Sequence, residues 1–350
     1  MSGAIPDVLS TPSLFLDVPL FEAQAKQIAE FCSCRQIRWW PNGVELCVLP
    51  LMECVLSLGA SGFSSSKFPA SGRLGAYSPE CRVRFTQILP DPQPQLRTFR
   101  PEKLRHLSLI CDHFAQAEQL SVIGEEVGFP LSILLEVNLG RNQTGVRPGV
   151  DARDLIRGIQ TLSGVALVGV TGTPRLPELP EVTADLSSQI GLLTSLLPLL
   201  QTGDEPPQVQ LVIPCGCELP EELEGVTDLC TPSLLRTNSP SAGRSPLTLR
   251  STVISRPKLE RAVLDVGRFH TGTNTLQIRS TVSGRPLPDI QSIMVDDELT
   301  TLTLGPESLD LTIGDIVEVE LPDPELAWRL HSLVHGGSEQ SPDFSSAISY

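Results

Sequence analysis

The chain has 350 residues, 40% of them hydrophobic, and a formal net charge of −15. This length suits one large domain with a buried core and a smaller second domain. The negative charge excludes nucleic acid and an anionic membrane as main partners. The longest apolar run, residues 190–200, is too short to span a bilayer, and the N-terminus does not resemble a signal peptide, so we expect a cytoplasmic protein.

The first predicted elements are a strand at residues 11–18 and a helix directly after it. Pro19 suits the first turn of a helix, where its missing N–H costs no hydrogen bond. Helical spacing then marks the buried side of this helix, which is formed by Phe21, Ala25, Ile28 and Cys32.

From there to about residue 240, apolar runs of strand length alternate with helical segments. The predicted strands include 131–137, 165–170 and 208–213, and the predicted helices are 101–124, 151–160 and 181–200. Alternating strands and helices are typical of parallel strands joined by crossover helices. Over this length the pattern favours a (β/α)8 barrel, although an open parallel sheet remains the alternative.

Composition changes at residues 236–246, where Ser, Pro and Gly dominate as in a linker. Short β-rich runs follow at 247–255, 262–266, 275–282, 290–295, 299–304 and 316–321. We therefore predict an α/β barrel domain over residues 11–240 and a small antiparallel β domain over 241–337. The polar residues 338–350 are predicted to be a frayed tail.

Two stretches in the first part of the chain carry a family resemblance. Residues 37–47 read I-R-W-W-P-N-G-V-E-L-C, and residues 56–63 read L-S-L-G-A-S-G-F. They resemble the "V-R-x-R-P-H-x-K-T-H-K … L-x-x-G-A-x-G" segment of the pyridoxal-phosphate enzymes grouped as D-threonine aldolases and D-serine dehydratases. The resemblance extends over residues 11–335. It implies a (β/α)8 barrel of the alanine racemase N-terminal type, followed by a small antiparallel β domain, with chemistry at the carboxyl ends of the barrel strands.

The position of the family's cofactor-binding lysine is occupied by Val44. In the family this lysine forms a Schiff base with pyridoxal phosphate, which requires a primary amine that valine lacks. The only other lysine that follows a predicted barrel strand is Lys67, which is the fallback candidate. The remaining lysines of the chain are Lys26, Lys103 and Lys258.

The other cofactor positions implied by the resemblance are also altered. Gln143 replaces the arginine that faces the pyridine ring, and Thr173 replaces a tyrosine of the site wall. In the phosphate-binding loop Gly216 is retained, but Pro214 offers no N–H and Glu218 would repel a phosphate. We therefore expect no bound cofactor.

The resemblance also assigns a divalent metal site to a late segment of the chain. The family's His and Cys/Asp ligands are replaced here by Pro324 and Leu326, whose side chains cannot ligate a metal ion. Asp323 and Glu325 beside them are expected to be solvated carboxylates, and no metal is expected.

These observations lead to three hypotheses. The first is a non-catalytic relative of the family that acts as a binding or interaction protein, as a homodimer or in a heterodimer with an active paralogue. The second is an active lyase or isomerase on D-amino acids that binds pyridoxal phosphate through Lys67. The third is another chemistry at the barrel mouth, using Arg141, Arg175, Cys215, Cys217 and Glu218.

Overall fold

The structure is a computed structural model that describes residues 10–42, 48–66, 81–89, 91–97, 99–176, 185–200, 205–214, 217–236, 244–338 and 341–348. It divides into two compact units. One unit is Lys26–Ser233, and the other combines Met1–Ala25 with Leu234–Tyr350. We describe each unit by itself.

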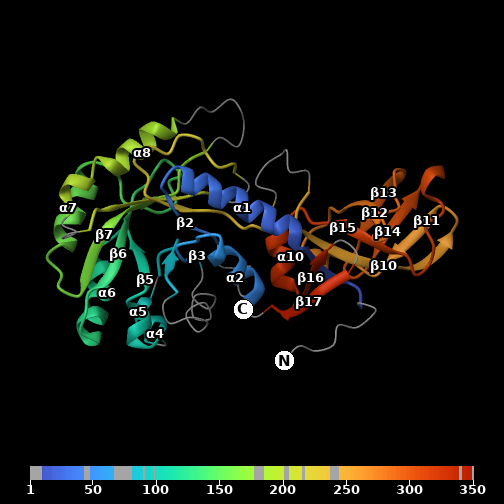
Figure 1. Cartoon of the computed structure of the whole chain (residues 1–350), viewed down its shortest axis with the longest axis horizontal. Coiled ribbons are helices and arrows are strands. Elements are labelled where there is room, and N and C mark those ends of the chain that lie inside the picture. The colour runs from blue at the N-terminus through green and yellow to red at the C-terminus, as the bar shows by residue number, and fades with distance from the viewer. Residues whose placement is uncertain are drawn as a thin grey trace. The chain divides into compact units, whose positions relative to one another are not determined.

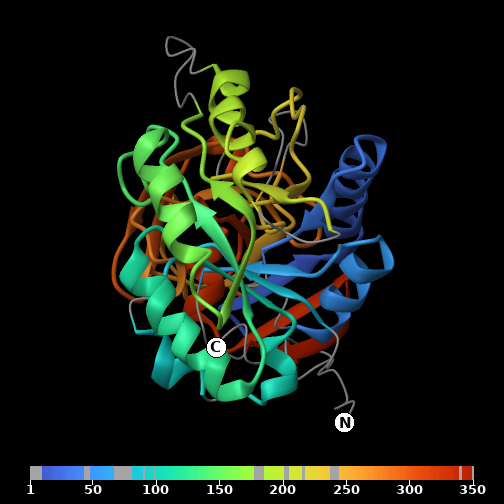
Figure 2. The ribbon, with the colours of Figure 1, turned by 90° about the vertical axis from the view of Figure 1, so that its left-hand side faces the viewer.

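The unit Lys26–Ser233 is built on eight strands in the order β2-β9-β8-β7-β6-β5-β4-β3 (Figures 1 and 2). Their bounds are β2 Arg38–Trp40, β3 Phe63–Ser65, β4 Val83–Phe85, β5 Leu107–Cys111, β6 Leu131–Glu136, β7 Val165–Gly172, β8 Gln208–Val212 and β9 Asp228–Cys230. Every neighbouring pair is parallel. The first and last strands approach each other through a bridge between Asn42 and Ser64, so the sheet is a nearly closed barrel, as predicted.

Helices cover the outside of this barrel. They are α1 Val18–Cys34, α2 Leu49–Ser57, α4 Pro92–Leu96, α5 Pro101–Leu104, α6 Phe114–Val127, α7 Val150–Ile159, α8 Leu186–Thr194 and the short 3-10 helix η2 Leu197–Leu199. The division between the two units falls within α1. Helix α6 packs on β5, β6 and β7, and α7 and α8 also pack on β7. The apolar stripe predicted for α1 is confirmed, because Phe21, Ala25, Ile28 and Cys32 are all buried.

Two helix predictions in this unit were wrong in extent. The predicted helix 101–124 is interrupted by strand β5, so it consists of α5, β5 and the first part of α6. The run Leu107–Cys111 is short and apolar, and such a run fits a buried strand and a buried helix turn equally well. The predicted helix 181–200 begins only at Leu186 among the described residues and ends in η2.

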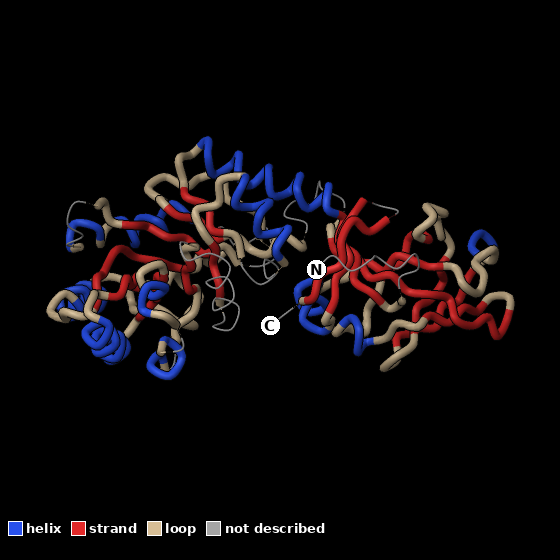
Figure 3. The backbone as a smooth tube through the Cα atoms, turned by 60° about the horizontal axis from the view of Figure 1, so that its bottom comes forward, coloured by secondary structure: helices blue, strands red, loops and turns tan. Residues whose placement is uncertain are grey.

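The second unit holds a nine-stranded sheet, drawn among the red strands of Figure 3. Its strands are β1 Ser13–Asp17, β10 Leu247–Lys258, β11 Arg261–Leu264, β12 Gln277–Thr281, β13 Ile290–Val295, β14 Thr300–Leu304, β15 Ile316–Glu320, β16 Leu333–Ser338 and β17 Ser341–Ala347. The short helices are α9 Arg268–Thr271, η4 Pro306–Ser308 and α10 Pro324–Leu330. All strand pairs are antiparallel except β1 with β16, which confirms the predicted β-rich second unit.

The unit boundaries differ from the predicted domains 11–240, 241–337 and 338–350. Strand β1 pairs with β10 and β16, so it belongs to the β unit and not to the barrel. Residues 341–347 form β17 on β16 in place of the frayed tail. Pairing with strands far away in the sequence decides the place of β1. Strand β17 instead pairs antiparallel with β16, its neighbour along the chain.

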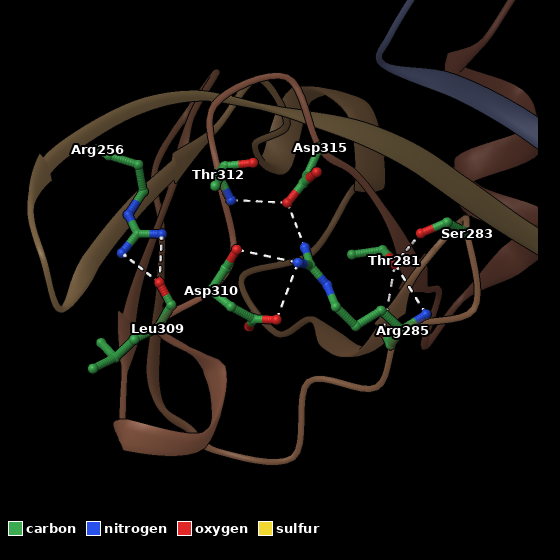
Figure 4. Close-up of polar contacts among 8 residues, drawn as sticks. All are labelled: Arg256, Thr281, Ser283, Arg285, Leu309, Asp310, Thr312 and Asp315. Atoms are coloured by element: carbon green, nitrogen blue, oxygen red, sulfur yellow. Dashed lines mark hydrogen bonds and ion pairs between the residues drawn. The ribbon is translucent and has the colours of Figure 1, made fainter.

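The turn of the β unit that contains the segment L-T-I-G-D-I-V is held by Arg285 (Figure 4). Its guanidinium donates to Asp315 and, at 3.1 Å, to both the backbone carbonyl and the carboxylate of Asp310. Asp315 also accepts the backbone N–H of Thr312 at 2.8 Å. Every carboxylate in this cluster therefore serves the turn, which assigns the cluster to the stability of the β unit.

Candidate functional site

Several of the predicted site residues cannot be placed. Val44, Lys67, Cys215 and Gly216 lie outside the described residues. Gln143, Thr173 and Cys217 are described, and they belong to loops that follow barrel strands β6, β7 and β8. These loops form the carboxyl-terminal mouth of the barrel, the face that carries the chemistry in barrels of this kind.

The interior of the barrel below this mouth is crossed by Arg84 from strand β4. Its guanidinium donates to Gln210 at 2.8 Å and to Gln208 at 2.7 Å, and lies 3.0 Å from Asp228. Strand β4 does not neighbour β8 or β9 in the sheet, so these contacts pass through the interior. The guanidinium also stacks on Trp40, 3.9 Å from the ring centre. Branched apolar layers usually fill such an interior, whereas here a polar network does.

Asp228 is the anion of this network and is fully buried. Its carboxylate also accepts from Arg38 at 2.7 Å, from the Trp40 indole at 2.8 Å and from Thr227 at 2.6 Å. Burial lowers the pKa of Arg84, and the charge of Asp228 opposes that shift. Asp228 begins β9, so the network lies toward the amino-terminal half of the barrel, where side chains serve stability more than chemistry.

A row of registered side chains connects this network to the mouth. Glu136 pairs with Thr171, Thr171 with Gln210, and Gln210 with Asp228 across adjacent parallel strands. Registered partners point to the same face of a sheet, so all four face the interior with Arg84. The row ends at Glu136, the last residue of β6, because barrel strands are staggered.

Glu136 is the buried acid of the mouth, with only 6% of its surface exposed. One carboxyl oxygen accepts from the Thr144 hydroxyl at 2.8 Å, and the other is buried without a hydrogen-bond partner among the described residues. Burial raises the pKa of Glu136 to about 6, and the nearby Asp112 carboxylate adds to this rise.

The loop that covers Glu136 turns tightly at Gly145. Gly145 has φ +96° and its N–H donates to Asp112 at 2.8 Å, and a Cβ at this position would come within 2.5 Å of the Asn138 nitrogen. Gln143 is exposed, and its carbonyl accepts from Arg141 at 3.4 Å. The two arginines of this loop are exposed and point to other partners: Arg141 donates to Gln143, and Arg147 pairs with Asp151.

An open hollow of about 500 Å³ lies beside the same loop. Its lining residues are Asn138, Gly140, Asn142, Gly145, Arg147, Pro148 and Asp151. The charges in this lining are opposite and close, since Arg147 lies 3.6 Å from Asp151. Neither Glu136 nor Gln143 contributes to the lining, so the hollow is separate from the buried acid.

The remaining mouth residues provide few reactive groups. Thr173 is half-buried, and the exposed Arg175 extends beside the Gly140 loop. Burial raises the pKa of Cys111, the last residue of β5, to about 12, which makes it a poor nucleophile. All described cysteines are free.

The predicted metal positions lie in the β unit. Pro324 is buried in the first turn of α10, and Leu326 packs on Gly272. Asp323 and Glu325 were predicted to be solvated carboxylates, but both pair with Arg236. Within the described ranges, no three His, Cys, Asp or Glu side chains are grouped to hold a metal ion.

Four buried polar residues of the barrel interior were missed in the sequence analysis: Arg84, Glu136, Gln210 and Asp228. Each is a polar residue inside or at the end of an otherwise apolar strand. Buried charges are rare unless they are paired, so this placement was the available signal. The signal identifies neither the partner nor the role of any of them.

No protein-family model and no curated protein matches the sequence. Solved structures with the same fold do exist. D-threo-3-hydroxyaspartate dehydratase from Delftia sp. HT23 has a TM-score of 0.76 and 16% identity, covering 97% of this chain and 98% of that one. D-threonine aldolase from Filomicrobium marinum has a TM-score of 0.75 and 16% identity, covering 97% and 94%. Alanine racemase from Bacillus anthracis has a TM-score of 0.71 and 11% identity, covering 97% and 98%.

At these identities the likeness establishes the fold, which is the alanine-racemase-like barrel with a β domain. A mutant of D-threo-3-hydroxyaspartate dehydratase has been solved in a metal-free form, with a TM-score of 0.77 and 16% identity over 97% of this chain and 98% of that one. In the described part of the chain, no helix is long and apolar enough to cross a membrane.

Proposed function

We propose that this chain is a non-catalytic relative of the pyridoxal-phosphate enzymes D-threonine aldolase and D-serine dehydratase, and that it acts as a binding or interaction protein. Its fold is that of D-amino-acid enzymes. The observation that carries the proposal is Val44 at the position of the family's lysine. Only a lysine side chain supplies the primary amine that the cofactor chemistry requires, and valine has none.

The described mouth residues support this proposal independently of Val44. Pyridoxal phosphate brings a ring nitrogen and a phosphate, and in the family an arginine faces that ring. Here that position is Gln143, which is exposed and accepts a hydrogen bond from Arg141. One buried carboxyl oxygen of Glu136 accepts no hydrogen bond from any described residue. Pro214 removes a backbone donor after β8. These residues do not fit the cofactor.

The proposed binding role includes a partner. A chain that keeps the fold without the chemistry is suited to pair with a second copy of itself or with an active paralogue, in the cytoplasm. Size-exclusion chromatography with light scattering of the purified chain distinguishes a monomer from a homodimer, and co-expression with an active paralogue tests the heterodimer.

The first test of the proposal is covalent trapping. We expect purified protein that is incubated with pyridoxal phosphate and reduced with borohydride to show no stoichiometric lysine adduct by peptide mass spectrometry, because Val44 has no amine. An active alanine racemase treated in the same way is the positive control. A stoichiometric adduct on Lys67, absent from a Lys67→Ala variant, would overturn the non-catalytic reading and favour the rival one of a lyase or isomerase that uses Lys67.

A second test restores the missing amine. We expect Val44→Lys to bind no pyridoxal phosphate at micromolar concentration, because the affinity for such a cofactor comes mainly from its phosphate and ring contacts. Visible absorbance after desalting reports whether a Schiff base persists. The matched variant Val44→Lys/Gln143→Arg shows how much one ring contact adds. Tight coloured binding by Val44→Lys alone would mean that the rest of the site is intact.

A further inference from the structure

The place of the family's metal site is filled by an arginine ion-pair cluster. Arg236 follows β9, and its guanidinium lies 2.7 Å from Asp323 and 3.4 Å from Glu325. It also donates to the carbonyl of Pro322 at 3.4 Å. These acceptors come from the start of α10, which contains the two metal positions of the family resemblance, Pro324 and Leu326.

This cluster is partly withdrawn from water. The side chain of Glu325 is only 14% exposed and that of Arg236 is 26% exposed. Asp323 is occupied twice, because the oxygen that meets Arg236 also accepts the backbone N–H of Leu326 at 3.1 Å and caps α10. A metal ion at this place would have to compete with both of these contacts.

The backbone that carries Arg236 is also anchored. The side-chain amide of Gln24 is buried and faces two backbone carbonyls, so its nitrogen and not its oxygen points toward them. In this orientation it donates to the carbonyl of Arg236 at 2.9 Å and to that of Leu234 at 3.1 Å. Both segments belong to the same compact unit as α10. The backbone of Arg236 is therefore fixed within the unit that carries its ion-pair partners.

We propose that Arg236 is the resident cation of this place and takes the charge-neutralising role of a divalent metal ion, so that the β unit binds none. A guanidinium stays protonated at every physiological pH and offers several donors in a fixed plane, which suits two carboxylates. Arg236 and a divalent cation close to the same carboxylates would repel each other. Two features therefore disfavour a metal ion at this place: the charge of Arg236, and the lack of ligand atoms in the side chains of Pro324 and Leu326.

This inference is independent of the proposed function, because it concerns the β unit alone. A lysine that binds pyridoxal phosphate in the barrel would not affect the proposal for Arg236. Metal binding in the β unit would not affect the expectation that no Schiff base forms. The two failures are therefore distinguishable, by cofactor trapping in one case and by zinc affinity in the other.

The test uses zinc chloride as the probe and the full chain as the protein. We expect the wild type to show no zinc-dependent rise in Tm and no effect of EDTA. We expect Arg236→Met to lower Tm, since it leaves two carboxylates facing each other, and zinc to recover part of that loss. The matched control Arg236→Lys keeps the charge and should lower Tm less, without a response to zinc.

A second set of variants restores the ligand atoms. Pro324→His/Leu326→Cys should bind zinc weakly while Arg236 is present, and adding Arg236→Met should tighten binding by about 10- to 100-fold, the range in which outer-shell partners tune metal sites. Circular dichroism checks the folding of each variant, and the single Arg236 variants decide the question if the double variant fails to fold. Tight zinc binding by the wild type that is lost in Glu325→Gln would overturn the proposal, as would an unchanged Tm of Arg236→Met.

Discussion

Asp228→Ala should destabilise the barrel unit by roughly 3–5 kcal/mol, the usual cost of removing one partner of a buried ion pair. The substitution leaves the Arg84 guanidinium in the barrel interior without its counter-ion and removes the acceptor of the Trp40 indole. Folded domains are stable by only about 5–15 kcal/mol, so the loss is a large part of the total. Urea unfolding followed by far-UV circular dichroism measures it.

Two variants make this result specific. Asp228→Asn keeps the shape and some of the hydrogen bonds but removes the charge, so it should fall between Asp228→Ala and the wild type. Glu126→Ala removes the partner of Arg97 in an exposed pair at 2.9 Å, and exposed pairs contribute about 0–1 kcal/mol. If Asp228→Ala and Glu126→Ala cost the same, the interior network does not stabilise the barrel as we describe.

Glu136→Gln should change the pH dependence of stability between pH 4 and pH 7, as expected for a buried acid. Burial raises the pKa of Glu136 from its ordinary 4.5 to about 6 in the folded chain, so the ionised form opposes folding. This cost is complete above pH 6 and disappears as the pH falls below 4.5. The difference between these two pKa values corresponds to about 2 kcal/mol.

We therefore expect the wild type to gain stability relative to Glu136→Gln as the pH falls through that window, by up to about 2 kcal/mol. Urea unfolding at a series of pH values gives the difference curve. Glu126→Gln, which changes an exposed carboxylate in the same unit, should give a nearly flat curve. A flat curve for Glu136→Gln as well would show that Glu136 has an ordinary pKa, and that its second oxygen has a partner in solution.

Local patterns were sufficient for most secondary structure. Residues 131–137, 165–170 and 208–213 were predicted as strands and are β6, β7 and β8. These apolar runs are of strand length and contain β-branched residues, which decides between a strand and a buried helix turn. The error at residues 101–124 arose because a short apolar strand, β5, lies directly between the helices α5 and α6. Its apolar residues were therefore counted as part of the helical pattern. The β-rich runs after residue 247 became β10 to β15 with small shifts at their ends.

The candidate site was predictable only in part. That Val44 carries no amine, and that the side chains of Pro324 and Leu326 carry no ligand atoms, follows from the residue types alone. The contact of Arg236 with Glu325 was not predictable, because these residues are far apart in the chain and no local period relates them. The same reason hid the contact between Arg84 and Asp228.

The sequence by itself determined the alternation of strands and helices, the change to β structure after residue 247, and the residue types available for chemistry. These features follow from side-chain spacing and from chemical identity, which are local properties. The tertiary structure alone decided that β1 joins the β unit, that one buried oxygen of Glu136 has no partner among the described residues, and that Arg236 pairs with Asp323 and Glu325. Backbone pairing and buried charges depend on which distant segments meet, because hydrogen bonds and ion pairs form only at short range.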